Sequence, residues 1–375
     1  MNTKIARFVA EQQPATPCLI VDLDVVEENY RTLEAALPEA LIYYAIKANP
    51  APAILTLVAG LGGSFDCASV PEIEMALAAG ATPDRISYGN TIKKKADVAR
   101  AFQLGVRLFA FDCEAELAKI GEVAPGSRVF CRILTSGEGA EWPLSRKFGC
   151  DLAMAKDLLR RARDFGVVPW GVSFHVGSQQ KDPGQWDGPI AEVARLFREL
   201  EEEGVVLGMI NLGGGFPTRY RTAILGPAVY GRAIHASLVR HFGNNMPVAI
   251  IEPGRGLVGD AGVIHTEVVL VSRKSANDDK RWVYLDIGKF GGLAESMDEA
   301  IQYPIHSERT GAEEPVIIAG PTCDSADVIY ERCDYRLPAD LQIGDRLEIR
   351  STGAYTTTYS AVAFNGFAPL ASYYV

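Results

Sequence analysis

Two kinds of segment alternate from the start of the chain to about residue 255, and they differ in how apolar and polar residues are arranged. Short apolar runs predict β-strands, and the longer segments between them, with apolar residues at every third or fourth position, predict helices. Several strands are apolar throughout, as a parallel sheet buried on both faces requires. The predicted strands are 18–22, 41–46, 64–68, 85–88, 107–111, 128–134, 170–175, 209–212 and 248–251. The predicted helices are 25–37, 51–59, 71–79, 94–104, 114–123, 152–165, 188–203 and 222–242.

This alternation fits either a (β/α)8 barrel with one strand outside it or an open, doubly wound sheet. Polar residues at the ends of the predicted strands favour the barrel, because a barrel brings all its strand ends to one rim, whereas an open sheet disperses most of them. These residues are Lys47, Asp66, Arg132, His175, Gly213–Gly215 and Glu252. We therefore predict an α/β fold in which residues 17–260 form a TIM-like (β/α)8 barrel.

The pattern changes near residue 262, where predicted strands follow one another with little helix between them. The segments 265–272, 281–287, 315–319 and 345–351 have the composition of strands. A second, mainly β domain over residues 261–375 is therefore expected, and residues 1–16 are a candidate addition to it.

The charge balance limits the partners that suit this chain. Asp and Glu number 47 against 37 Lys and Arg, a formal net charge of −10. Nucleic acids and anionic membranes attract basic surfaces, so neither is expected as a partner, whereas a small cationic substrate suits an acidic chain.

Targeting and metal-binding patterns are missing from the sequence. No apolar run approaches the roughly 18–20 residues that span a membrane, and the N-terminus does not read as a signal peptide. The seven cysteines are scattered and never form a C-x-x-C pair, and the five histidines have no metal-ligand spacing. We expect a reduced, cytoplasmic protein without a metal.

Two predicted strand ends carry side chains suited to amine and ring chemistry. Lys47 ends the apolar run LIYYAIK, where buried walls that disfavour its charged form would make it an amine nucleophile. Taken alone, it is more simply a lysine whose charged end reaches solvent. His175 lies in the segment Ser173–Ser178 after another strand, and taken alone it is more simply a buried core histidine.

Glycine and carboxylate motifs follow two later strands. Gly213–Gly215 would let backbone N–H groups approach a phosphate, and a tight turn alone rarely needs three glycines. The motif is not G-x-G-x-x-G, so a dinucleotide is not implied. In the segment Glu252–Arg255 the carboxylate can meet a positively charged ring nitrogen and the arginine suits a phosphate, although an ion pair between the two is the alternative.

The second predicted domain adds a thiol and a phenol. Cys323 lies in the segment Gly320–Asp324 beside a carboxylate that disfavours the thiolate, so it is expected to remain a proton donor, unless it is an inert small apolar residue. Tyr355 follows a glycine turn. The barrel motifs together describe a phosphate cradle, a nucleophilic lysine, a histidine and a carboxylate at one barrel mouth. Pyridoxal phosphate (PLP) requires that set.

In their order along the chain, these motifs resemble those of the fold-type III PLP-dependent decarboxylases, which include ornithine, lysine and diaminopimelate decarboxylases. The resemblance extends from about residue 17 to the C-terminus. It implies an alanine-racemase-like architecture and a homodimer with shared active sites. The matching segments are Tyr44–Asn49, Ser173–Ser178, Gly213–Pro217, Glu252–Arg255, Gly320–Asp324, Gly353–Tyr355 and Phe364–Phe367.

The resemblance implies a role for each matching residue. Lys47 would be joined to the PLP aldehyde, His175 would stack on the ring and Glu252 would meet the pyridine nitrogen. Cys323 and Asp324 would come from the partner subunit, with Cys323 returning a proton to Cα after CO2 has left. The residues implied near the rest of the cofactor are Asp66 and Arg132, with Ser178, Gly213, Gly214, Gly215, Gly254, Arg255 and Tyr355 at its phosphate.

The motif around Cys323 favours a substrate with a distal amine. It reads G-P-T-C-D, the ornithine/lysine type, whereas diaminopimelate decarboxylases usually carry Cys-Glu-Ser there and need an arginine for a second carboxylate. The chain departs from eukaryotic ornithine enzymes at Phe290, where they have a tyrosine, and its segment 291–300 does not align cleanly with their substrate-binding aspartate. The residues expected around the substrate are Cys323, Asp324 and Tyr355, with Glu295, Asp298 and Glu299 as candidates for the second amine contact.

The expected reaction is decarboxylation of L-ornithine to putrescine, a step of polyamine biosynthesis, with L-lysine to cadaverine as a second activity. One methylene separates the two substrates, which is worth about 1–3 kcal/mol of discrimination. The alternatives are a lysine or diaminopimelate decarboxylase, a racemase of the same fold, which typically sets an arginine at the ring nitrogen, and an inactive, antizyme-inhibitor-like homologue. Retention of Lys47, His175, Glu252 and Cys323 argues against the inactive homologue.

Overall fold

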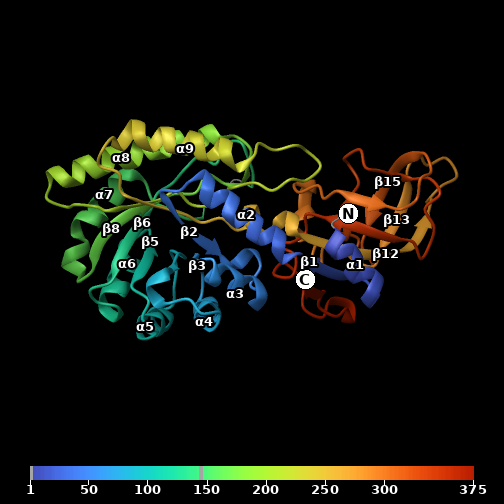
Figure 1. Cartoon of the computed structure of the whole chain (residues 1–375), viewed down its shortest axis with the longest axis horizontal. Coiled ribbons are helices and arrows are strands. Elements are labelled where there is room, and N and C mark those ends of the chain that lie inside the picture. Colours follow the sequence, from blue (N-terminus) through green and yellow to red (C-terminus); the bar gives the residue numbers. More distant parts are fainter. Residues whose placement is uncertain (1–2, 143–146) are drawn as a thin grey trace. The chain divides into compact units, whose positions relative to one another are not determined.

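The computed structural model describes residues 3–142 and 147–375 and divides them into two compact units (Figure 1). The barrel unit comprises Glu27–Pro217 and Ile224–Gly256. The β unit comprises the described residues up to Val26, together with Thr218–Ala223 and Leu257–Val375. Each unit has its own sheet and its own buried core.

The described residues of the barrel unit include eight parallel strands that close into a barrel, which confirms the predicted fold. Their order around the barrel is β10-β11-β2-β3-β4-β5-β6-β8. Because all of them are parallel, their C-terminal ends lie on one rim. The strands are β2 (Ala40–Ala45), β3 (Ser64–Cys67), β4 (Ile86–Tyr88), β5 (Leu108–Phe111), β6 (Arg128–Arg132), β8 (Val168–Ser173), β10 (Met209–Asn211) and β11 (Val248–Ile251).

Helices flank the outside of the barrel strands, as Figure 1 shows. Side-chain caps fix where two of them begin. Ser69 accepts a hydrogen bond from the N–H of Glu72 before α4, and Asp151 accepts one from the N–H of Met154 before α7. The helices are α2 (Leu23–Ala36), α3 (Pro52–Gly60), α4 (Val70–Ala78), α5 (Lys95–Gln103), α6 (Glu114–Val123), α7 (Leu152–Arg161), α8 (Asp187–Glu202) and α9 (Pro227–Phe242). Two short antiparallel strands that were not predicted, β7 (Ala140–Trp142) and β9 (Ser178–Gln180), pair with each other.

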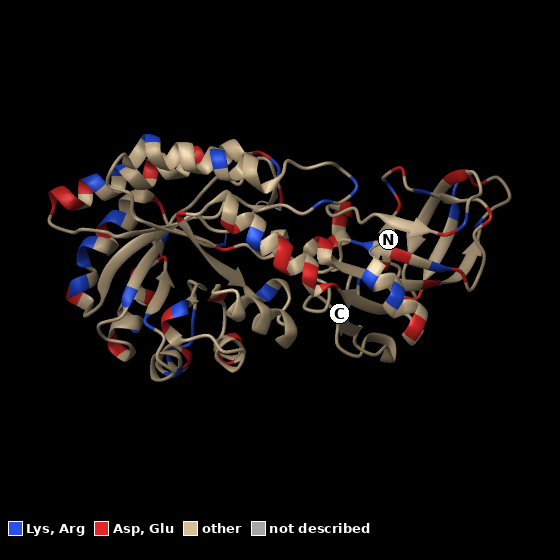
Figure 2. Ribbon diagram, viewed as in Figure 1, with Lys and Arg blue, Asp and Glu red and all other residues tan. Residues whose placement is uncertain are grey.

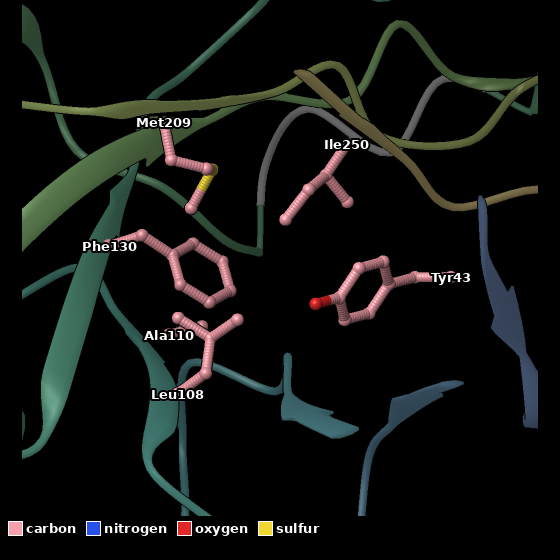
Figure 3. Packing of buried hydrophobic residues seen from close by; sticks show 6 residues of the cluster. All are labelled: Tyr43, Leu108, Ala110, Phe130, Met209 and Ile250. Carbon is pink, nitrogen blue, oxygen red and sulfur yellow. The ribbon is translucent and has the colours of Figure 1, made fainter. Parts of the chain in front are cut away.

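Apolar side chains fill the interior of the barrel (Figure 3). They come from β2, β5, β6, β10 and β11, and the Tyr43 ring points toward the other members of the cluster. Burial of apolar surface stabilises a fold by about 25 cal/mol per Å², so this cluster fixes the strands relative to one another below the rim. The cluster consists of Tyr43, Leu108, Ala110, Phe130, Met209 and Ile250, with half-buried Trp170 packed against it.

The β unit has a nine-stranded sheet among its described residues. The first predicted strand belongs to this sheet and not to the barrel, because β1 pairs antiparallel with β12 and parallel with β19. Helix α1 (Thr3–Gln12) precedes it, and Ile5 packs with Cys18 and Ile20 in a buried cluster. The strands are β1 (Cys18–Val21), β12 (Gly262–Ser272), β13 (Arg281–Leu285), β14 (Ile305–Ser307), β15 (Glu313–Ala319), β16 (Val328–Tyr330), β17 (Arg336–Pro338), β18 (Arg346–Arg350) and β19 (Ala371–Tyr374).

Lys and Arg positions and Asp and Glu positions both occur along the barrel helices in Figure 2. Arg100 pairs with Glu74 at 2.9 Å and Arg161 with Asp157 at 3.2 Å, all with substantially exposed side chains. Such surface pairs contribute about 0–1 kcal/mol each to stability. The acidic surplus therefore matters more for the long-range attraction of charged ligands. Among the helices of the described residues, none is both long and apolar enough to cross a membrane.

Candidate active site

The turn that carries Lys47 is closed by two residues of its own sequence motif. Lys47 lies in the short 3-10 helix η1 (Ile46–Ala48), directly after β2. The Tyr44 hydroxyl donates to the backbone oxygen of Asn49 at 2.9 Å, and Asn49 Oδ1 accepts from the N–H of Ala51 at 3.2 Å. These bonds define the turn and leave the Lys47 side chain half-exposed at the rim of the barrel.

Asp66 lies beside Lys47 on the neighbouring strand. Ala45 of β2 pairs with Asp66 of β3, and Lys47 Nζ is 3.4 Å from Asp66 Oδ2. Ser87 donates to Asp66 Oδ1 at 3.3 Å, and a Cβ added to Gly89 would come within 1.9 Å of the same oxygen. The buried carboxylate is therefore fixed next to the amine.

His175 is neutral, and one of its ring nitrogens is engaged. It lies two residues after β8, and the N–H of Gly177 donates to Nδ1 at 2.9 Å. Burial lowers the pKa of His175 well below its usual value, and the positive charges of Arg132 and Lys47 lower it further. Because Nδ1 accepts a hydrogen bond, the ring proton is on Nε2.

Arg132, the last residue of β6, adds a positive charge to the same rim. Burial lowers the pKa of its guanidinium, while the negative charges of Glu252, Asp66 and Asp112 act in the opposite direction. Arginine remains protonated in proteins, so Arg132 faces these carboxylates as a cation.

The loop Gly213–Gly215 fits only residues without a side chain. A Cβ on any of the three glycines would come within 2.2–2.6 Å of a backbone oxygen. A Cβ on Gly214 would also lie 3.2 Å from His175 Nε2 and 2.6 Å from the backbone oxygen of Glu252. The first and third glycines have φ angles of 67° and 100°, which favour glycine. The loop therefore packs directly between the segments that carry His175 and Glu252.

Three aromatic side chains support the base of this loop. Trp186 Nε1 donates to the backbone oxygen of Leu212 at 3.1 Å. The Trp186 ring lies 5.4 Å from the ring of Phe216 and 5.9 Å from that of Tyr230, centroid to centroid. Packed aromatic pairs of this kind hold the glycine backbone in a fixed position.

Glu252 follows β11 and receives a short hydrogen bond. Asn211 Nδ2, at the end of the adjacent strand β10, donates to Glu252 Oε1 at 2.5 Å. Burial raises the pKa of Glu252 to about 7, and the negative charge of Asp66 adds to this shift. Lys47, Asn211 and Arg132 act in the opposite direction by favouring the ionised carboxylate.

Ser178 and Arg255 form a second polar cluster of the barrel unit. Arg255 is buried and begins the short helix α10 (Arg255–Val258), and buried Gly254 precedes it. Its guanidinium donates to Ser178 Oγ from Nε at 3.3 Å and from Nη2 at 3.2 Å. A guanidinium beside a hydroxyl is a combination that binds phosphate oxygens.

Cys323 and Asp324 lie on an exposed loop of the β unit, between β15 and β16. The N–H of Cys323 donates to Asn365 Oδ1 at 3.0 Å. Buried Asp327 holds the base of the loop, because its Oδ2 accepts from both the N–H and the hydroxyl of Thr322, at 3.2 and 2.7 Å. The loop backbone is thus anchored while the thiol and the Asp324 carboxylate stay exposed.

The three acidic candidates for the distal-amine contact differ in exposure. Glu295 is buried, whereas the Asp298 side chain is 87% exposed. Burial would raise the pKa of Glu299, but three backbone N–H donors outweigh it and lower the pKa. These donors are the N–H groups of residues 331, 332 and 333, at 2.7–2.8 Å. Of the three carboxylates, Asp298 is the one that faces solvent.

The structure brings one group of the predicted residues together and holds the other in the β unit. Tyr355, in the β unit, is half-buried with a φ of 56°, and its ring lies 5.5 Å from that of Tyr359. Asn211 was not predicted as a site residue, although it begins the motif N-L-G-G-G. In the barrel unit are Lys47, Asp66, Arg132, His175, Ser178, Gly213–Gly215, Glu252, Gly254 and Arg255. In the β unit are Cys323, Asp324, Tyr355, Glu295, Asp298 and Glu299.

The residues of the barrel rim fit PLP. An amine, a half-buried carboxylate and a neutral imidazole suit the aldehyde, the ring nitrogen and the ring face of that cofactor. The glycine loop offers backbone where any side chain would collide, and Ser178 with Arg255 suits a phosphate. In the part of the chain that the structure describes, no cluster of His, Cys, Asp and Glu could hold a metal ion.

Comparisons with known proteins agree with this fit. A family model described as "Pyridoxal-dependent decarboxylase, pyridoxal binding domain" matches residues 23–259. The chain is 36% identical over 368 residues to the lysine/ornithine decarboxylase of Selenomonas ruminantium, covering 98% of this chain and 91% of that protein. It is 33% identical to antizyme inhibitor 2 of Xenopus laevis, covering 97% of this chain and 82% of that protein.

Solved structures extend the similarity to the whole fold. The S. ruminantium lysine decarboxylase in complex with PLP and cadaverine has a TM-score of 0.89 to this chain and is 34% identical, with 99% of this chain and 93% of that chain covered. The family model spans more than half of the chain, and the relatives exceed 30% identity over nearly all of it. The chain therefore belongs to the pyridoxal-dependent decarboxylase family, with PLP as its cofactor.

Proposed function

We propose that this chain decarboxylates L-ornithine to putrescine and L-lysine to cadaverine, each with release of CO2. The observation that carries the substrate class is the exposed carboxylate of Asp324 directly after exposed Cys323. A carboxylate suits a distal ammonium, and the segment 320–327 contains no arginine or lysine for the second carboxylate of diaminopimelate. The S. ruminantium relative, named for both lysine and ornithine, supports the same substrate class.

Ornithine is the proposed preferred substrate and lysine the second. The two differ by one methylene, which changes binding by about 1–3 kcal/mol in a tailored pocket. Asp298 is the proposed second contact for the distal amine, because Glu295 is buried and the oxygens of Glu299 accept backbone hydrogen bonds.

The barrel residues hold the cofactor and set its charge. When bound, PLP supplies an electron sink for the electron pair that departing CO2 leaves behind. Lys47 Nζ would hold the aldehyde carbon, and the Glu252 carboxylate would pair with the ring nitrogen. His175 would lie against the ring as a neutral imidazole and would add no positive charge there. Arg255 and the glycine loop would bind the phosphate.

Cys323 supplies the proton that completes the reaction. Each turnover releases one CO2 and adds one proton to Cα, so a donor has to reach that carbon. Protonation at a carbon other than Cα would give an aldehyde instead of an amine. The position of the proton donor therefore determines the product.

We propose further that the active protein is a homodimer in which Cys323 and Asp324 serve the partner's barrel. The loop of Cys323 is exposed and is tied through Asn365 to a segment that leaves apolar side chains in solvent. Exposed apolar groups beside a functional loop are typical of a protein–protein interface. They are Tyr359, Val362 and Phe367, at 52%, 89% and 46% exposure.

A side-by-side assay tests the proposed reaction. Purified protein with PLP is incubated with L-ornithine, L-lysine, L-arginine and diaminopimelate, and both CO2 and the amine product are measured. We expect CO2 with putrescine from ornithine and with cadaverine from lysine, ornithine being the better substrate, and neither product from Lys47→Ala. Turnover of arginine or diaminopimelate alone would overturn the substrate class, and D-ornithine without CO2 would indicate a racemase.

An inactive homologue is the second candidate, because antizyme inhibitor 2 of X. laevis is 33% identical to this chain. The lysine, histidine and carboxylate of the barrel rim argue for a catalyst. The two are distinguished by absorbance, since PLP joined to a lysine absorbs visible light. A band present in the wild type and lost in Lys47→Ala supports the enzyme, whereas no band in the wild type favours the inactive homologue.

A further inference from the structure

Asn211 links two parts of the barrel rim that are far apart in sequence. It is the last residue of β10 and its side chain is buried. Its Nδ2 donates to Glu252 Oε1 at 2.5 Å, and its Oδ1 accepts from the N–H of Gly213 at 2.9 Å. The N–H of Glu252 in turn donates to the backbone oxygen of Gly213 at 2.8 Å. The three residues therefore form a closed ring of hydrogen bonds.

The two bonds of the Asn211 side chain determine which way its amide faces. Only the amide oxygen can accept from the N–H of Gly213, and only the amide nitrogen can donate to a carboxylate. A donor aimed at Glu252 Oε1 favours the ionised form of that carboxylate and leaves Oε2 for a further partner. An aspartate at this position would keep the bond to Gly213 but turn an acceptor toward Glu252.

We propose that Asn211 is a positioning residue that favours the ionised form of the Glu252 carboxylate and holds that carboxylate beside the glycine loop. The ring-nitrogen contact and the phosphate cradle are thereby set at a fixed spacing before PLP enters. This inference rests on the role proposed above for Glu252. Asn211 acts through Glu252 and Gly213 and does not itself touch the reacting atoms.

Two variants of Asn211 distinguish a purely structural role from control of Glu252 ionisation, because the two roles predict opposite orders of severity. Asn211→Leu has nearly the same shape but loses both hydrogen bonds, whereas Asn211→Asp keeps the bond to Gly213 and opposes Glu252 with a second carboxylate. If the residue only braced the loop, the leucine variant would be the worse of the two. If it keeps Glu252 ionised, the aspartate variant is worse, because two adjacent carboxylates cannot both ionise readily.

The test is the affinity of the apoprotein for PLP as a function of pH. Below the pKa of Glu252 the carboxyl is neutral and no longer offers a negative charge to the protonated ring nitrogen, so affinity for PLP falls on the acid side. Removing the donor raises that pKa. The acid limb, which is the part of the pH profile where PLP affinity falls with falling pH, then moves to higher pH. We expect a shift of about one pH unit or more for Asn211→Asp and a smaller one for Asn211→Leu. Titrations of free PLP are common to all variants and cancel in the comparison.

The matched control is Asn90→Asp, the same chemical change at an asparagine whose side chain bridges two backbone groups. Asn90 donates to the backbone oxygen of Ala68 and accepts from the N–H of Ile92, and neither bond involves Glu252. We expect its acid limb to coincide with that of the wild type. Thermal unfolding of each apoprotein checks that the variants fold, and the infrared band of the protonated carboxyl follows Glu252 without any cofactor.

Three results would overturn the inference. They are an unshifted acid limb in Asn211→Asp, a larger shift in Asn211→Leu, or an equal shift in Asn90→Asp. The infrared band decides the matter if one variant does not fold, because it has to persist to higher pH in the other. If the wild type binds no PLP, the proposed role of the whole rim fails together with that of Asn211. If it binds PLP normally and the variants do not differ from it, only the role of Asn211 fails.

Discussion

Burial disfavours the charged form of Glu252, and neighbouring groups partly offset this effect. Burial raises its pKa to about 7, and nearby Asp66 acts in the same direction. Lys47 and Arg132 oppose the shift with positive charge, and Asn211 opposes it with a hydrogen bond. A protonated ring nitrogen would add a further positive partner and complete the stabilisation of the carboxylate.

This balance predicts a pH dependence of stability in the apoprotein. The pKa of Glu252 is about 7 in the folded protein against 4.5 for a free side chain, so between these pH values the folded state binds more protons than the unfolded state. The free energy of unfolding should therefore fall as pH rises from about 4.5 to about 7, by up to about 3 kcal/mol from this group. Chemical denaturation of the apoprotein across that range measures the effect.

Glu252→Gln is the control for that measurement, because glutamine fills the same space and does not ionise. The part of the pH dependence that belongs to Glu252 should be missing from the variant. Equal slopes of unfolding free energy against pH in the two proteins would mean that Glu252 is not the buried group that titrates.

At the scale of single residues, the sequence predicts those with unusual chemistry better than those that position them. Lys47 and Glu252 stand out because a charged residue ends an apolar strand. Asn211 does not, because an asparagine at a strand end is common and its two hydrogen bonds depend on β11 and on the glycine loop. Glu299 is one of three predicted substrate contacts, and its oxygens accept backbone N–H groups that only the fold brings near.

At the scale of elements, the glycine loop is the segment with the least freedom to change. We predict that Gly214→Ala abolishes or strongly weakens PLP binding, because the added methyl group would lie 2.6 Å from the backbone oxygen of Glu252 and 3.2 Å from His175 Nε2. Backbone atoms cannot move aside as a flexible side chain can. Fluorescence titration of the apoprotein with PLP measures the loss.

Gly188→Ala is the matched control for the loop. A Cβ on Gly188, at the start of α8, meets nothing within 4 Å, and alanine favours a helix over glycine by about 1 kcal/mol. Stability should be unchanged or slightly higher and PLP affinity unchanged. Normal PLP affinity in Gly214→Ala would show that the loop adapts and is not the cradle proposed here.

The barrel strands were predictable because each is a local apolar run that a parallel sheet buries on both faces. The position of β1 was not, since Cys18–Val21 is as apolar as any barrel strand. Its partners β12 and β19 lie more than two hundred residues away, and pairing over such a distance leaves no local signal. The short strands β7 and β9 likewise depend on a pairing partner that lies beyond α7 and β8 in the chain.

At the scale of the whole molecule, the proposed exchange of Cys323 between subunits predicts complementation. Lys47→Ala and Cys323→Ala should each form no amine product alone, because each removes one residue from every site. Mixed after dissociation and reassociation, they should recover about a quarter of wild-type activity, since half of the dimers are mixed and each mixed dimer has one intact site of two.

The complementation measurement needs proof that mixed dimers form, which affinity tags of two kinds supply. Cys113→Ala, a change at another exposed cysteine, should be fully active and should gain nothing from mixing. Isolated mixed dimers without activity would contradict shared sites. The sequence indicated this assembly only through resemblance, because an interface depends on surfaces that form after folding.

Chemical labelling identifies most directly which lysine carries PLP. Borohydride reduction of the PLP-loaded protein makes the link between cofactor and lysine permanent, and peptide mapping by mass spectrometry then locates it. We expect a pyridoxyl group on Lys47 and none on Lys93, whose pKa burial lowers to about 8 but whose amine pairs with Glu116 at 2.9 Å. An unlabelled Lys47 peptide, or a label on another lysine, would contradict this expectation.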